Sequence, residues 1–147
     1  MKVKVFQKNG YSSDKELSVK IEKEINEWLT TTRNIRITDA QIASSVIVKP
    51  GRQMIYVQAL CILMYEQEDK ESTDSLRYTV KLIADTVIHN RPMEREFKIQ
   101  SVIDDWINTD LNVTIQLVRI ASDSASWSDD NGYYWYCYHY SCLLISQ

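Results

Sequence analysis

The chain has 147 residues, of which 44% are hydrophobic, and its formal net charge at pH 7 is -3. This length predicts one compact domain, and the acidic balance argues against a long nucleic acid as the partner. No apolar run approaches the roughly 20 residues that span a bilayer, and residues 1–5 lack the apolar segment of a signal peptide. We therefore expect a cytoplasmic protein that does not bind a membrane.

A strand and a helix are predicted at the start of the chain. Val3 and Val5 alternate with lysines, as in a strand with one polar side. Residues 13–16, Ser-Asp-Lys-Glu, have the form of a capping box, which opens a helix. The apolar residues that follow at helical spacing are Leu17, Ile21, Ile25, Trp28 and Leu29. We expect this stripe to pack on a sheet.

A β-hairpin is predicted next. Residues 34–48 are rich in isoleucine and valine, and the change of phase near Asp39 and Ala40 indicates a bulge or kink. A Pro-Gly pair at residues 50–51 predicts the turn, and Met54–Tyr65 returns as a strand. A polar, mostly acidic connector follows. The first part of the chain therefore predicts a β-α-β-β unit.

The second half repeats this order. It opens with Val-Lys-Leu-Ile, which matches the Val-Lys-Val-Phe near the N-terminus, and its predicted helix aligns Ile103 with Ile25. A hairpin loop predicted over Ala121–Asn131 lengthens the second copy, and beyond this loop Cys142 aligns with Cys61. Because the matches keep one order along the chain, we interpret it as a tandem duplication.

The predicted fold class is α+β, with two tandem β-α-β-β repeats in one compact domain. The first unit covers residues 1–66, the connector residues 67–77 and the second unit residues 78–147. A crossover through a helix returns the chain to the same sheet, and the hairpin then fills the neighbouring place. We therefore expect six mainly antiparallel strands in one sheet, with both helices on one face.

The last strand indicates which face the helices cover. An Asn-Gly turn signal at residues 131–132 opens a strand dense in aromatic residues. Alternation defines a tyrosine row made of Tyr136, Tyr138 and Tyr140. The repeat alignment matches this row with the uniformly apolar row around Cys61. We expect both rows to lie under the helices, and the opposite face of the sheet to remain open.

The open face is the predicted functional surface. Its cations and flat aromatic or amide groups can hold a phosphate and stack on a base. The candidate ligand-binding residues are Lys4, Arg36, Tyr56, Lys81, Trp135 and His139. Its apolar end is typical of an interface, and the candidate interface residues are Leu60, Ile62, Met64 and Leu143. Trp127, in the predicted loop, either closes over a ligand or packs against its own sheet.

The sequence offers no recognisable catalytic apparatus. Its three glycines all fall at predicted turns, which excludes a glycine-rich phosphate loop. Neither histidine has carboxylates or cysteines at metal-ligand spacing, so we expect no metal and no cofactor. The three cysteines lie inside predicted strands and are expected to be buried free thiols. We therefore do not expect an enzyme.

Three segments of the first half carry a resemblance. They are the opening Met-Lys-Val-Lys-Val-Phe, the helical stretch over residues 24–29 and the apolar strand that closes with Tyr65 and Glu66. Through these segments, the first unit resembles a family of very short sporulation-associated proteins from spore-forming bacteria. The resemblance implies a single β-α-β-β unit, here present twice. It implies no functional residue, because that family has no established reaction.

Two functions are compatible with the open face. The first is a non-catalytic protein that captures a small anionic, nucleotide-like ligand, as phage proteins do when they sequester immune signalling nucleotides. The alternative is a sporulation-associated or other assembly or adaptor protein that acts by homo-oligomerisation or by contact with another protein. A homo-oligomer is expected in both cases, since a ligand can also lie at a subunit junction.

Overall fold

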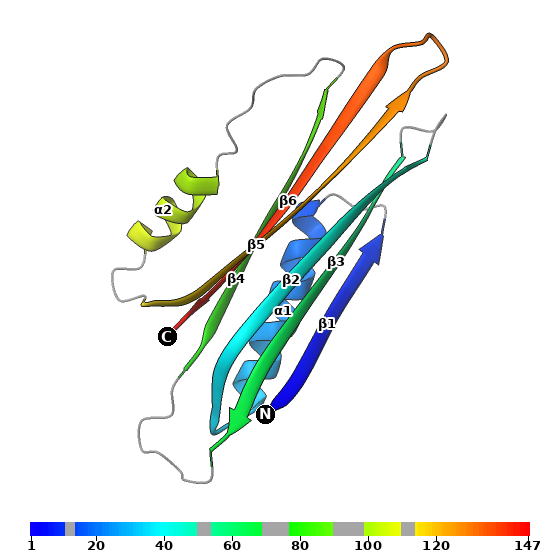
Figure 1. Ribbon diagram of the computed structural model, residues 1–147. Helices are drawn as coiled ribbons and strands as arrows, with labels where there is room; N and C mark the ends of the chain where they lie inside the picture. Colours follow the sequence, from blue (N-terminus) through cyan, green and yellow to red (C-terminus); the bar gives the residue numbers. More distant parts are fainter. Residues whose placement is uncertain (11–13, 50–53, 69–76, 90–98, 110–113) are drawn as a thin grey trace.

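The computed structural model describes residues 1–10, 14–49, 54–68, 77–89, 99–109 and 114–147. Its elements are β1 (Lys2–Gly10), α1 (Asp14–Thr31), β2 (Ile35–Lys49), β3 (Met54–Gln67), β4 (Thr79–His89), α2 (Ile99–Thr109), β5 (Ile115–Ser128) and β6 (Tyr134–Ser146). Each half of the chain has the order β-α-β-β (Figure 1), which confirms the predicted α+β class. The predicted helix cap at residue 13 and the turn at residues 50–51 lie outside the described residues.

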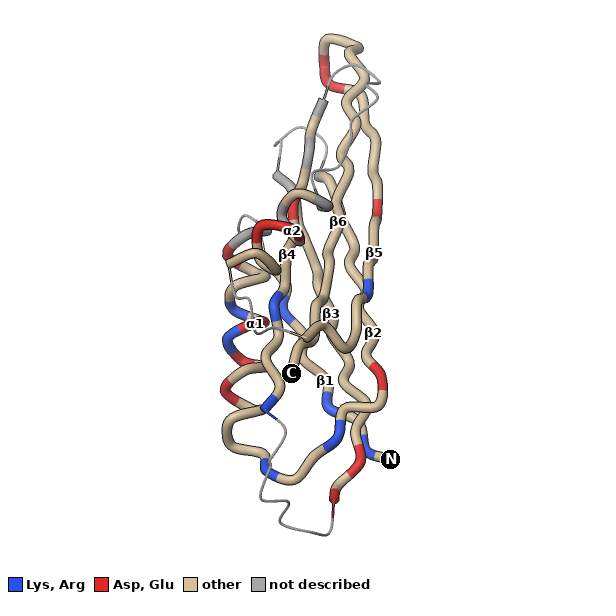
Figure 2. The backbone as a smooth tube through the Cα atoms, turned by 90° about the vertical axis from the view of Figure 1, so that its left-hand side faces the viewer, with Lys and Arg blue, Asp and Glu red and all other residues tan. Residues whose placement is uncertain are grey.

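The six strands form two three-stranded antiparallel sheets instead of the single six-stranded sheet that we expected. The first sheet has the order β1-β3-β2 and the second the order β4-β6-β5, so the last strand of each unit lies in the middle. The strands of both sheets run along the long axis of the molecule (Figure 2). Helix α2 lies on the side of the second sheet that points away from the first (Figure 1). The helices therefore do not share one face of a common sheet.

The two units share their strand register. Cys61 in β3 lies opposite Ile42 in β2, and Cys142 in β6 lies opposite Ile120 in β5. The sequence repeat matches the same two cysteines. It also aligns residues 34–37 with residues 112–115, and when this alignment is continued along the strand, Ile42 matches Ile120. Equivalent residues therefore occupy equivalent places in the two sheets.

A bulge interrupts the second strand of each unit at the same place. The register shifts between Ile37 and Asp39 in β2 and between Ile115 and Leu117 in β5. The first bulge confirms the kink predicted from the change of phase near Asp39, and the second begins at Ile115, the residue that the repeat aligns with Ile37. Because a bulge is a specific feature of a strand pair, its recurrence supports the proposal of a tandem duplication.

The two sheets face each other, and the core lies between them. We call the face that each sheet turns toward the other its inner face. On the first sheet the inner face carries Phe6, Ala40, Val46, Val57, Ala59, Cys61 and Leu63, and on the second Val80, Leu82, Cys137, Leu143 and Ile145. All of these are buried, and they pack in two clusters together with Leu17, Ile21 and Ile25 of α1. The predicted apolar stripe of the first helix is thereby confirmed.

Helix α1 covers the free edge of β4 as well as part of the core. The side-chain amide of Asn26 donates to the carbonyl oxygen of Val80 and accepts from its backbone amide, both at 2.9 Å. Glu22 accepts from the backbone amide of Leu82 at 3.0 Å and pairs with the ammonium group of Lys81 at 3.2 Å. These side chains occupy backbone groups through which β4 would otherwise pair with another strand. At these residues the edge of β4 is therefore closed to further strand pairing.

A second group of polar contacts joins β2 to β5. Arg119 donates through Nε to the carbonyl oxygen of Ala40 at 2.9 Å, and its guanidinium group pairs with Asp39. The backbone amide of Val46 donates to the carboxylate of Asp123 at 2.8 Å. The two neighbouring strands thus meet through side chains and belong to different sheets.

The predicted hairpin loop over Ala121–Asn131 is wrong, because most of it is strand. β5 runs through this segment to Ser128, and the turn is confined to the residues around Gly132, whose φ is 78°. Serines occupy every second position from Ser122 to Ser128 and are exposed, whereas the residues between them are half-buried. This period of two is the signature of a strand, and the low hydrophobicity of serine concealed it.

Candidate functional site

The two lysines predicted to bind a ligand lie near α1, and not on a common open face. Lys4 is opposite Leu63 in the strand register, so it belongs to the same side of β1 as Phe6. Its Nζ lies 5.7 Å from the centroid of the Phe6 ring. Lys81 pairs with Glu22. The expectation that Lys4 shares a face with Tyr56 is wrong, because the pairing of β1 with β3 turns the valines of β1 toward that face.

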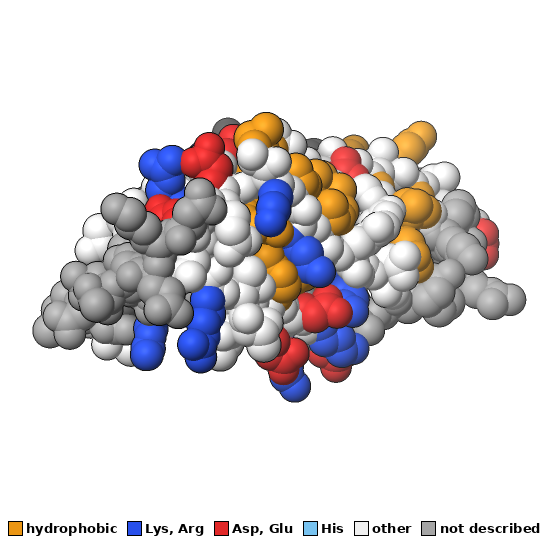
Figure 3. Space-filling view, turned by 90° about the horizontal axis from the view of Figure 1, so that it is seen from below, with side chains coloured by type: hydrophobic (Ala, Val, Ile, Leu, Met, Phe, Trp, Pro, Cys, Tyr) orange, Lys and Arg blue, Asp and Glu red, His pale blue; other side chains and the backbone are white. Residues whose placement is uncertain are grey.

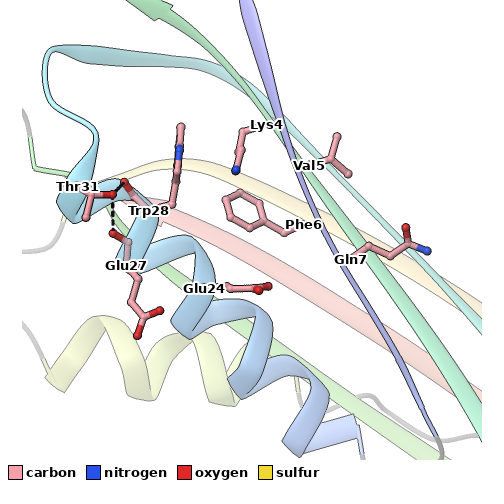
Figure 4. A pocket seen from close by; sticks show the side chains of 8 residues that line it. All are labelled: Lys4, Val5, Phe6, Gln7, Glu24, Glu27, Trp28 and Thr31. Atoms are coloured by element: carbon pink, nitrogen blue, oxygen red, sulfur yellow. Dashed lines mark hydrogen bonds between the residues drawn. The ribbon is translucent and has the colours of Figure 1, made fainter.

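A surface pocket of about 470 Å³ lies beside Lys4. Its lining residues are Lys4, Val5, Phe6, Gln7, Glu24, Glu27, Trp28 and Thr31. Figure 4 shows Lys4 and Trp28 beside the Phe6 ring, which Trp28 contacts edge-on with ring centroids 5.9 Å apart. Glu24 and Glu27 contribute two carboxylates from α1 against the single ammonium group of Lys4. Both carboxylates already have lysine partners, since Glu24 pairs with Lys8 at 3.0 Å and Glu27 with Lys23 at 3.7 Å.

Arg36 and Tyr56 are on the outer face of the first sheet, the face that points away from the second sheet. Arg36 pairs with Glu66 on the neighbouring strand and lies 4.0 Å from Glu68. The hydrogen bond between the two side chains raises the pKa of Arg36 and lowers the pKa of Glu66. The charge of Arg36 is therefore already compensated, and Tyr56 is half-buried.

His139 and Trp135 are on the inner side of the second sheet. His139 is buried, with Thr86 Oγ1 2.9 Å from its Nδ1 and Ser141 Oγ 3.0 Å from its Nε2. Trp135 donates through Nε1 to Asp129 at 3.0 Å and stacks on Trp127 with ring centroids 6.3 Å apart. Trp127 thus packs against its own sheet. The prediction that this face of the second unit stays open is wrong, because it forms the interface with the first unit.

The predicted interface residues separate in the same way. Leu60, Ile62 and Met64 are half-buried on the outer face of the first sheet, whereas Leu143 is fully buried between the sheets. The prediction for Leu143 is therefore wrong. The residues of both units were assigned to the open face by the same alternation. In the second unit, however, the face equivalent to the outer face of the first sheet packs on the first unit.

The outer face of the first sheet is the candidate functional surface. Three of its residues that the sequence analysis missed are strongly exposed: Val3 (56%), Val5 (52%) and Ile47 (52%). The register places them with the half-buried apolar residues of β3, since Val3 lies opposite Met64 and Ile47 opposite Tyr56. The alternation of β1 was visible in the sequence, but only its pairing with β3 shows which side the valines share.

This surface has an apolar middle and a charged margin. It is an open sheet face with apolar side chains in its middle and the charged group of Arg36, Glu66 and Glu68 at one end. From the end at which the N-terminus lies, hydrophobic side chains reach the molecular surface among charged ones (Figure 3). An apolar patch with a polar rim is typical of protein interfaces.

The described part of the chain has neither a metal-ligand cluster nor a membrane-spanning helix. Within it, no three His, Cys, Asp or Glu side chains come together as potential metal ligands. None of the helices in the described ranges combines the length and the apolar character needed to cross a membrane. No protein-family model, curated protein or solved structure matches the chain.

Proposed function

We propose that this protein is a non-catalytic assembly or adaptor protein that acts through protein-protein contact at the outer face of the first sheet. The observation that carries the proposal is the exposure of Val3, Val5 and Ile47 on a sheet face that no other element covers among the described residues. Burial of apolar surface is worth about 25 cal/mol per Å². A partner that covers this face gains that free energy.

The arrangement of the predicted ligand residues supports this choice over ligand capture. His139 is buried, and Lys81 and Arg36 have carboxylate partners. Tyr56 and Lys4 point to opposite faces of the first sheet. Capture of a nucleotide-like anion stays a prediction without a single site, and the resemblance of the first half to sporulation-associated proteins also stays a prediction.

A charge on the candidate surface tests the proposal. Ile62→Asp should abolish association, because a carboxylate in an apolar contact loses its hydration without gaining a partner. Val19→Asp is the matched control, because Val19 is 61% exposed on α1 and away from the candidate surface. The native mass of each protein, purified from cells that carry its natural partners, is measured by sedimentation velocity.

The wild type and Val19→Asp should sediment as complexes, and Ile62→Asp as the 17.2 kDa chain. Circular dichroism shows whether Ile62→Asp is folded. A folded Ile62→Asp variant with the native mass of the wild type would overturn the proposal. Mass spectrometry of the denatured wild type tests the other prediction, since release of an intact nucleotide would favour ligand capture.

A further inference from the structure

The two units of the chain stack front to back. The inner face of the first sheet carries Cys61, whereas its equivalent Cys142 lies on the outer face of the second sheet, since Cys142 is opposite Ile83 and the inner-face residue Leu143 is opposite Leu82. Two equivalent units therefore meet through two different faces. An interface of this kind is heterologous, and it leaves one unused copy of each face at the ends of the stack.

The first unused face is the outer face of the first sheet. Val3 and Val5 pair with Met64 and Ile62 in the same way as Val80 and Leu82 pair with Ile145 and Leu143. Val80 and Leu82 are 1% and 4% exposed because they pack on the first unit. Their equivalents Val3 and Val5 are 56% and 52% exposed. The same apolar pattern thus exists twice and is covered once.

The second unused face is at the other end, on the outer side of the second sheet. Val118 and Ile120 on β5 are 39% and 57% exposed. Their equivalents on β2 of the first unit are Ala40, which is fully buried, and Ile42, which packs against the core beneath the second unit. The β5 side of this face is therefore free, whereas its centre is already covered, because Tyr140, Cys142 and Leu144 of β6 are 4%, 0% and 0% exposed.

We infer that a second copy of this chain docks at the candidate surface in a head-to-tail arrangement. The outer face of the first sheet of one copy packs on the outer face of the second sheet of the next, as the two units already pack within the chain. Such contacts are not two-fold symmetric, so they produce a ring where the rotation between copies closes and an open-ended stack where it does not. The inference rests on the proposed function and gives the partner a chemical identity.

The polar contacts between the two units of one chain have no equivalent in the contact between copies. Their absence should weaken the association of copies. Arg119 and Asp123, which bind β2 within the chain, correspond to Gln41 and Ser45 on the outer face of the first sheet. The contact between copies thus lacks the ion pair and has no connecting chain to raise the effective concentration. We expect reversible association that increases with protein concentration.

Two variants, each blocking one end, provide the test. Val5→Asp places a charge on the first unused face and Ile120→Asp on the second, both on exposed positions of strands at sheet edges. In sedimentation velocity, the average mass of the wild type and of Val19→Asp should rise with concentration beyond twice the 17.2 kDa chain. Each blocked variant alone should remain a monomer, because every copy lacks the same face.

Mixing the two blocked variants gives the decisive result. One intact face remains on each variant, so an equimolar mixture should form a complex of two chains and nothing larger. This rescue also shows that both variants are folded. If Ile120→Asp associates like the wild type while Val5→Asp does not, head-to-tail docking is wrong and the proposed contact surface stands. A wild type that is monomeric at every concentration also overturns the inference, and the comparison of Ile62→Asp with Val19→Asp then decides the proposed function separately.

Discussion

Several buried side chains of this protein are polar or reactive. His139 is bracketed by hydroxyl groups of Thr86 and Ser141, which satisfies both ring nitrogens in the buried interface. Cys61 and Cys142 are buried free thiols, as predicted. Burial raises the pKa of both thiols, and that of Cys61 to about 12. These residues contribute to packing, and burial favours the protonated form of the two thiols.

The thiol of Cys61 should therefore be inert in the folded protein. Because the thiolate is the reactive form, a pKa of about 12 leaves about one thiol in 10⁴ ionised at pH 8. Native protein should gain no iodoacetamide adduct at Cys61 over hours at pH 8, and urea-unfolded protein should react within minutes. Peptide mass spectrometry measures both. Equal rates in the two states would contradict the buried position.

The same pKa predicts how stability changes at alkaline pH. Between the ordinary value of 9.0 and about 12, the native Cys61 retains a proton that the unfolded chain releases. Stability should therefore fall as pH rises above about 9. Cys61→Ala should show a smaller fall over this range, measured as the free energy of unfolding in urea, although its stability at pH 7 is lower.

Helix α1 has two roles that its sequence periodicity reveals only in part. Its apolar stripe, with Ile21 and Ile25 fully buried, packs in the core as the spacing predicts. Directly after each of those residues, Glu22 and Asn26 lie one turn apart and bind the backbone of β4. A helix that occupies a strand edge in this way prevents further strand pairing. The helix thereby closes this edge of the second sheet at Val80 and Leu82.

Substitution of Asn26 tests this role. Asn26→Ala removes the partners of both the amide and the carbonyl group of Val80, and each unpaired backbone group costs about 1–3 kcal/mol. We expect a loss of about 2 kcal/mol in the free energy of unfolding, measured in urea. Asn26→Asp keeps an acceptor for the amide but sets a carboxylate oxygen against the carbonyl oxygen of Val80, so it should also lose stability.

Thr30→Ala is the matched control on the same helix. The Thr30 hydroxyl is exposed and donates only to a carbonyl oxygen of its own helix, so this change should stay within about 0.5 kcal/mol of the wild type. Equal stability of Asn26→Ala and Thr30→Ala would show that the contact with β4 contributes nothing.

The whole molecule is held together by an interface between its two units. Apolar residues from both inner faces share one core cluster, so neither unit retains a complete core without the other. The upper halves of β5 and β6 carry few charges, whereas the surface of α1 carries many (Figure 2). At the margin of the interface Arg119 and Asp123 join β5 to β2. We expect a single cooperative unfolding transition for the chain.

The contact between Asp39 and Arg119 should make this interface sensitive to acid. The backbone amide of Ala40 donates to Asp39, and this bond, with the hydrogen bond from Arg119, holds the pKa of Asp39 below its ordinary value of 3.8. The stabilisation is therefore present above pH 3.8 and is lost as pH falls through the lowered pKa of the folded state. Asp39→Asn should unfold at lower urea than the wild type at pH 7.

The difference between Asp39→Asn and the wild type should narrow as pH falls toward 2, because both then lack the charge. Asp130→Asn, at the exposed turn after β5, is the control and should follow the wild type over the whole range. A constant difference between Asp39→Asn and the wild type from pH 7 to pH 2 would indicate that the carboxylate charge contributes nothing to the interface.

The local structure of this protein can be predicted from its sequence alone. Periods of two and of about 3.6 residues identify the strands and the helices, since these patterns follow from backbone geometry. The change of phase at Asp39 located a bulge, and the match between Cys61 and Cys142 identified equivalent strands. The prediction failed over residues 121–128, where alternating serines carry too little hydrophobic contrast for the period to be recognised.

How the units meet, and which face remains open, depends on tertiary contacts. Alternation divides a strand into two faces, but it does not state what covers either of them. In this chain, one of two equivalent faces is buried and the other is open: Leu143 is buried, and its equivalent Ile62 lies on the open outer face. The physical reason is that the same apolar face can pack on a neighbouring unit or remain free. Which of the two occurs depends on contacts between residues far apart in the sequence, such as Asn26 with Val80 and Asp39 with Arg119.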